Sequence, residues 1–162
     1  MSKKKDTSER GLFKEEIQSA LFQSSDIKEL LLGNTNDMSK KQVITNFQNH
    51  VKSHLFVDDT LTDADSYIFY DVKFPALKPH IKHCTVIMYA ICHRSILDNY
   101  EKEGFYGNRA DVLSQMIEEV LINDKDTVRN FGIGELSLDS VDIYGSERYY
   151  GCVMYFSVPN FR

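Results

Sequence analysis

The segment that most constrains this fold is residues 81–94, because its side chains are apolar on both faces of a strand. Successive residues of a strand point to opposite faces of the sheet. One parity carries Cys84, Val86, Met88, Ala90 and Cys92, and the other carries Ile87, Tyr89 and Ile91. A strand that is apolar on both faces must be covered on both. One cover is a helix of this chain. The other face is expected to be covered either by another protein or by a second helical layer formed by residues 12–55.

Four segments carry the strand pattern. Apolar alternation predicts strands at residues 67–74, 81–94, 135–144 and 149–161. Pro75 and Pro79 bracket the first turn, where a missing N–H is harmless. In the third strand the apolar parity flips near Asp139–Ser140, which predicts a β-bulge.

Helical periodicity is strongest between the two hairpins. Apolar residues recur there at i, i+3, i+4, i+7 and i+8, namely Leu113, Met116, Ile117, Val120 and Leu121. Asn108 is expected to be the N-cap of this helix, with Asp111 in the capping-box position. Weaker apolar stripes predict further helices within residues 12–32 and 40–55.

These elements predict an α+β fold. Its sheet is four-stranded and mainly antiparallel, in the order β-β-α-β-β, with one main helix on one face and an N-terminal helical extension. The strand faces that are purely apolar are expected to meet the helix; in the last strand these residues are Cys152, Met154, Phe156 and Val158. The domains expected are a disordered tail at 1–11, the extension at 12–56 and the α+β domain at 57–162.

The opposite face of the sheet mixes tyrosines with aliphatic residues. This composition is typical of the cores of protein interfaces. The predicted interface consists of Tyr67, Phe69, Ile87, Tyr89, Ile91, Val153 and Tyr155, with the N-terminal helices beside them.

The net charge of the chain argues against nucleic-acid binding, and the spacing of its histidines and cysteines argues against a zinc site. The 24 acidic and 19 basic residues give a net charge of −5, which is unfavourable for binding nucleic acid. No zinc-ligand spacing occurs around His80, His83 and Cys84, and neighbouring residues on a strand point to opposite faces. No catalytic, metal or cofactor site is predicted, and no apolar run approaches the ~18 residues that a membrane span needs. The three cysteines are expected to be buried and free, since their odd number and spacing fit no disulfide framework.

Two alternatives stay open besides a structural protein. Asp58 or Asp59, together with Asp71 and Lys73, could hold Mg²⁺ beside a phosphate, as in a small nuclease. The other alternative is a small cytosolic adaptor domain with a dimeric sheet. Stacking of RNA bases on the exposed tyrosines is less favoured, because no basic–aromatic motif accompanies them.

The layout of residues 67–161 resembles the tail-terminator and head–tail connector (neck) proteins of long-tailed bacteriophages. The resemblance lies in the hairpin YIFYDVKF and IKHCTVIMYAICHR, the helix that opens with GNRADVLSQMIEEVL, and the closing hairpin ELSLDSVDIY and YYGCVMYFSVPNF. It implies a virion structural protein, assembled in the host cytoplasm, with no catalytic residues. Residues 12–55 depart from the pattern, because they add more helix before the first strand than many members carry.

The partners that the resemblance implies are further copies of the chain, in a ring that usually has six, and the proteins of the tail tube and neck. Such a ring terminates the tail tube or joins it to the neck. DNA passes through the opening without specific binding, and the negative net charge is compatible with that passage. The N-terminal extension is then expected to dock on a neighbouring subunit or on a neck protein.

Overall fold

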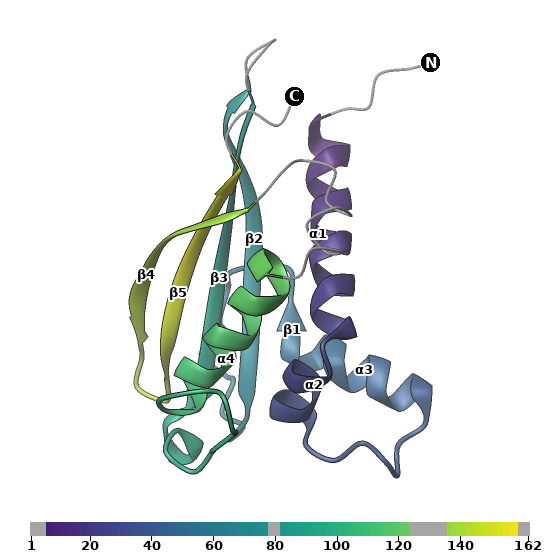
Figure 1. Cartoon of the computed structure of the whole chain (residues 1–162), viewed down its shortest axis with the longest axis vertical. Helices are drawn as coiled ribbons and strands as arrows, with labels where there is room; N and C mark the ends of the chain where they lie inside the picture. The colour runs from purple at the N-terminus through teal and green to yellow at the C-terminus, as the bar shows by residue number, and fades with distance from the viewer. Residues whose placement is uncertain (1–5, 78–81, 124–135, 159–162) are drawn as a thin grey trace.

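The computed structural model describes residues 6–77, 82–123 and 136–158. Its strands form one mixed sheet in the order β1-β2-β3-β5-β4, and the helices lie along one face of that sheet (Figure 1). In chain order the elements are α1 (Asp6–Gln23), α2 (Ser25–Leu32), α3 (Lys40–His50), β1 (Val51–Lys52), β2 (Ser66–Leu77), β3 (Lys82–His93), the 3₁₀ turn η1 (Arg94–Ile96), α4 (Arg109–Glu118), the π-helical turn η2 (Glu119–Asn123), β4 (Ser137–Gly145) and β5 (Tyr149–Val158).

The predicted α+β class is confirmed, but the sheet has five strands rather than four. The additional strand is β1, which pairs parallel to β2 with Val51 opposite Ile68. Two residues are too few to show strand alternation. Val51 also continues the helical spacing set by Phe47 in α3, so periodicity assigned it to the helix.

The N-terminal helices differ from the prediction at the point where the first one begins. The first helix begins at Asp6 rather than at Leu12, so residues 6–11 belong to α1 and not to a disordered tail. A new helix then begins after Ser24, whose hydroxyl accepts a hydrogen bond from the backbone N–H of Ile27 at 3.2 Å.

The predicted capping of α4 is confirmed. The backbone N–H of Asp111 donates to the side-chain oxygen of Asn108 at 2.9 Å, and the backbone N–H of Asn108 donates to the Asp111 carboxylate at 3.0 Å. Both backbone donors at the start of the helix are therefore satisfied.

The described part of the sheet has one register shift in β4 and one beside Pro75 in β2. The predicted bulge in β4 is confirmed, because the register shifts between Leu138 and Ser140. The sequence predicts a turn at Pro75, but β2 continues through it to Leu77 with a second register shift between Lys73 and Ala76. A proline fits within a strand at such a point because no ladder N–H is required of it. Pro79 lies outside the described residues.

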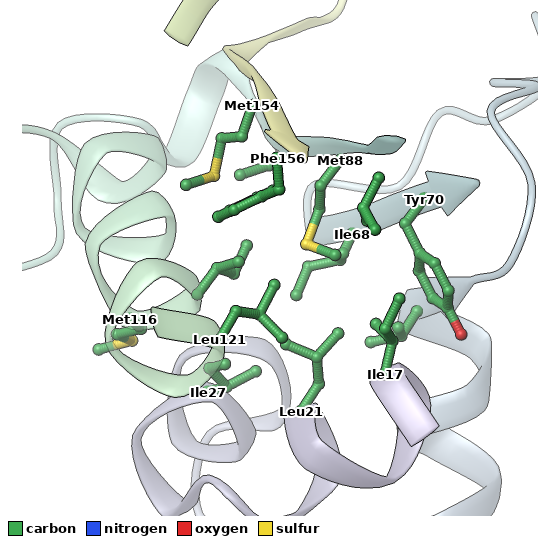
Figure 2. Packing of buried hydrophobic residues seen from close by; sticks show 14 of the residues in the cluster. Ile17, Leu21, Ile27, Ile68, Tyr70, Met88, Met116, Leu121, Met154 and Phe156 are labelled. Carbon is green, nitrogen blue, oxygen red and sulfur yellow. The ribbon is translucent and has the colours of Figure 1, made fainter. Parts of the chain in front are cut away.

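The main core lies between the helices and one face of the sheet. Figure 2 shows side chains of α1, α2 and α4–η2, such as Leu21, Ile27 and Leu121, pointing toward Met88 and Phe156 of the sheet. The predicted helix-facing parity of β3 and β5 is confirmed: Cys84, Val86, Met88, Ala90, Met154, Phe156 and Val158 are all buried there. The N-terminal helices therefore extend the layer formed by α4, and only the end of α3 reaches the opposite face, where His50 stacks on Tyr67.

Candidate assembly surfaces

The face of the sheet away from the helices carries a second apolar cluster. Tyr67, Phe69, Ile91 and Tyr149 are buried there, and Val57 and Leu61 pack against them. The last two residues belong to the segment between β1 and β2. One end of this face is thus covered by a loop of the same chain.

Hydrogen bonds hold this loop to the sheet. The Tyr149 hydroxyl donates to the backbone carbonyl of Asp63 at 2.8 Å, and the Arg148 guanidinium donates to that of Asp59 at 2.9 Å. The backbone N–H of His93 donates to the carbonyl of Asp65 at 3.0 Å. Each bond joins residues far apart in the sequence, so the loop is a fixed cover.

Under the loop, Tyr67 packs against other aromatic rings and its pKa is raised. The His50 ring stacks on Tyr67 with centroids 5.1 Å apart, and Tyr149 meets Tyr67 edge to face at 5.9 Å. Burial, with the carboxylates of Asp65 and Asp63 nearby, raises the pKa of the Tyr67 phenol above its ordinary value. The phenol therefore stays protonated at neutral pH.

The seven predicted interface residues do not share one environment. Four of them are buried within the chain: Tyr67, Phe69, Ile91 and Val153. The other three, Ile87, Tyr89 and Tyr155, are partly buried. Tyr89 also contacts Tyr144 of β4, with ring centroids 5.2 Å apart. Only the part of this face beyond the loop retains accessible aromatic and aliphatic surface.

Strand β4 forms one free edge of the sheet and exposes apolar side chains. Val141 is 54% exposed and Ile143 is 73% exposed. Their register partners are Met154 and Cys152, so both lie on the helix-side face of the sheet. The backbone N–H of Ile143 donates to the carboxylate of Asp142 at 3.0 Å. The sequence predicted the strand but not this exposure, which arises because β4 lies at the sheet edge outside the main buried core.

The opposite flank of the sheet is formed by α1, β1 and the outer part of β2. The Arg10 guanidinium donates to the backbone carbonyl of Val72 at 2.6 Å and pairs with the Asp71 carboxylate. Lys14 reaches the same carboxylate at 2.8 Å. Burial raises the pKa of Asp71, but the hydrogen bonds from Lys14 and Val72 and the two cationic charges outweigh it, so the pKa lies below its ordinary value. The local sequence does not predict these ion pairs, because Asp71 lies far along the chain from Arg10 and Lys14.

A shallow groove of about 330 Å³ lies between α1 and β1 on this flank. Lys14, Gln18, Lys52 and His54 contribute to its lining. The Tyr70 hydroxyl, also in the lining, lies within hydrogen-bond distance of the Lys14 carbonyl oxygen (2.9 Å) and the Gln18 side-chain oxygen (2.8 Å), and its one O–H donates to one of them at a time.

The residues considered for metal chemistry are not brought together. Within residues 6–77, 82–123 and 136–158, no group of three His, Cys, Asp or Glu side chains is arranged to hold a metal ion. Asp71 is engaged by the two cations of α1, and the Asp58 carboxylate accepts hydrogen bonds from Thr60 at 2.9 Å. His80 lies outside the described residues. The prediction for the cysteines is confirmed for Cys84 and Cys92, which are free and buried, whereas Cys152 is free but only partly buried.

Comparison with known families gives one decisive match. The family model YomW matches residues 24–158, which is most of the chain. The chain belongs to the YomW family. The match includes α2, α3 and the whole sheet, so two of the N-terminal helices lie within the family domain, whereas α1 precedes it. The family name comes from a gene cluster of an SPbeta-like prophage of Bacillus, which makes this a phage-related protein.

A comparison with curated proteins found no match. None of the helices in the described part of the chain is both long and apolar enough to cross a membrane.

Proposed function

We propose that this chain is a non-enzymatic structural subunit of a phage particle. It assembles into a ring at the head–tail junction or at the tail end, where it terminates the tail tube and joins it to the neck. Its family origin supports a phage role, and the layout of its hairpins and α4 supports the particular place in the particle.

The observation that carries this proposal is the exposed apolar edge of the sheet. Val141 and Ile143 lie on a strand with one open side, and both are more than half exposed. The backbone edge of β4 is protected by its bulge and by Asp139 and Asp142, as strand edges of monomeric proteins usually are. Its two exposed aliphatic side chains are not covered in the same way, and they are suited to side-chain contact with another subunit. Closed rings bury such surfaces symmetrically.

The proposal is tested by deleting the gene from a phage that encodes this chain and imaging the particles. Tubes of unregulated length and heads without tails are expected, with normal assembly restored by the gene supplied in trans. Mass spectrometry of purified wild-type particles should find the chain in a fixed ratio to the tail-tube protein. Normal particles after deletion, or a chain absent from purified virions, would refute the role.

A further inference from the structure

Helix α3 carries an exposed basic surface, whereas the surface formed by α4 and the helix-side face of β4 is acidic and partly apolar. We propose that α3 of one copy packs against β4 and α4 of the next copy, in a head-to-tail contact. This contact rests on the proposed ring and names the two surfaces that close it.

The layer of helices over the sheet is incomplete at β4. Helices α1 and α2 pack on β2, and α4 packs mainly on β3 and β5. Val141 and Ile143 lie on the helix-side face of β4, where they remain 54% and 73% exposed. One further helix beside α4 would cover both residues, as helices cover the rest of this face.

The surface around these two residues is acidic. The Ser114 side chain of α4 contacts the thiol of Cys152, which lies opposite Ile143 in the sheet register. Glu118 lies one helical turn after Ser114, and therefore on the side of α4 that is turned toward β4. Asp139 is exposed at the bulge of β4, and the nine residues of this strand include no Lys or Arg.

The one cation of α4 is held elsewhere. Arg109 lies in the first turn of this helix, and its guanidinium donates to the carbonyl of Ile96 at 3.0 Å and to the side chain of Asn99 at 2.9 Å. It is therefore bound to the segment before the helix. A partner that fits the surface beside β4 should bring both apolar and cationic side chains.

Among the α-helices that the structure describes, α3 has this composition. Its eleven residues include Lys40 and Lys41 and no Asp or Glu, whereas α1, α2 and α4 each contain acidic residues. Both lysines are exposed and lie three or four residues before Ile44, so they share a face with this 44% exposed side chain. Neither lysine forms an ion pair within the described part of the chain.

The position of the two lysines does not benefit α3 itself. Lys40 and Lys41 are the first two residues after the N-cap Ser39, at the positive end of the helix dipole. Cations are unfavourable there, and acidic residues would stabilise this turn. Contact with the carboxylates of a neighbouring copy gives the lysines the partners that they lack within their own chain.

The two surfaces lie on opposite sides of the molecule. Helix α3 leads directly into β1 at one edge of the sheet, and β4 forms the other edge (Figure 1). A contact between two different surfaces of identical chains is heterologous, and repeating it generates a ring when the rotation closes. Pairing of two β4 edges would bring like charges together and would end at a dimer.

The test reverses the charge of each surface in a separate variant of the full chain. The first variant is Lys40→Glu with Lys41→Glu, which places acidic residues in the first turn of α3 and should therefore not unfold it. The second is Glu118→Lys with Asp139→Lys. Lys73→Glu is the control, since Lys73 is exposed on β2 and lies outside both surfaces. Far-ultraviolet circular dichroism must show that all three variants fold.

Each charge-reversed variant alone should remain a monomer by light scattering at low ionic strength, where salt does not screen the charges, at concentrations where the wild type and Lys73→Glu form rings. An equimolar mixture of the two should assemble again, with equal numbers of both chains, because every contact in an alternating ring then joins an acidic surface to a basic one. Rings formed by either variant alone, or a mixture that stays monomeric, would overturn this contact and leave the ring itself standing. A wild type that never assembles would overturn the ring and this contact together.

Discussion

Truncation of Leu21 to Ala tests whether the N-terminal helices belong to the same folding unit as the sheet. Leu21 lies in the last turn of α1 and is fully buried in the core that also contains Met88 and Phe156. If the helices were a separable arm, this substitution would loosen them and leave the sheet intact. We expect instead that it destabilises the whole chain.

The magnitude follows from the volume removed. Leu→Ala deletes three buried carbon groups, and the lost transfer free energy at ~0.8 kcal/mol each is about 2.5 kcal/mol. The cavity left behind adds to this, so the free energy of unfolding should fall by about 3–5 kcal/mol. Helix propensity changes little, because Leu and Ala are both good helix formers. Leu12→Ala is the matched control: the same substitution in the same helix at a residue 38% exposed should cost less than about 1 kcal/mol.

Urea denaturation monitored by circular dichroism and by tyrosine fluorescence measures both variants, since the chain has no tryptophan. The protein concentration must be fixed, because oligomers make stability depend on it. The two probes should give one coincident transition, shifted to lower urea for Leu21→Ala. A new early transition that leaves the main one unmoved would show that α1 folds apart from the sheet, and would refute the single-core description.

Three further predictions have definite expected outcomes. Gly151→Ala should destabilise the chain by about 3 kcal/mol or more, because a Cβ there would lie 1.9 Å from the carbonyl oxygen of Ala90. Gly11→Ala is the control: open space surrounds Gly11, so this substitution should be neutral or stabilise the chain by up to about 1 kcal/mol. Equal shifts of the melting temperature for the two variants would contradict the steric argument. Asp71 has a pKa below its ordinary value of 3.8, so its ion pairs stabilise the fold above that pH and this contribution is lost as the pH falls through the lower, folded value; Asp71→Asn should flatten the acid side of the stability curve, and an unchanged acid limb would refute the pairing. Burial raises the pKa of Cys92 to about 11, so the Cys92 thiol should react with a thiol reagent at neutral pH only after unfolding. In Cys92→Ser, the number of slowly reacting thiols per chain should fall by one. Rapid labelling of Cys92 in the native protein would contradict its burial.

Much of the fold is predictable from local sequence alone. The spacing from Leu113 to Leu121 places α4, and the polar pair Asn108 and Asp111 fixes where it begins. The parity of β3 identifies the face that meets the helices, because side chains of a strand alternate strictly. The parity flip in β4 locates its bulge for the same reason.

The remaining features depend on contacts between distant segments. Nothing local predicts that the loop after β1 covers Tyr67 and Phe69, since this requires hydrogen bonds from Tyr149 and Arg148 at the far end of the chain. The apolar residues of that face were therefore assigned to a contact with another protein, although four of the seven are buried within the monomer. The exposure of Ile143 was missed for the converse reason, because apolar alternation marks a strand but does not show whether a helix reaches it.

The central claim is that this chain assembles with itself, and its mass in solution tests that claim most directly. Light scattering on the purified full chain, from micromolar concentration upward, should show a discrete species several times heavier than the 18.7 kDa monomer. It should dissociate when Ile143 is replaced by Lys. A mass of 18.7 kDa at every concentration would contradict the account.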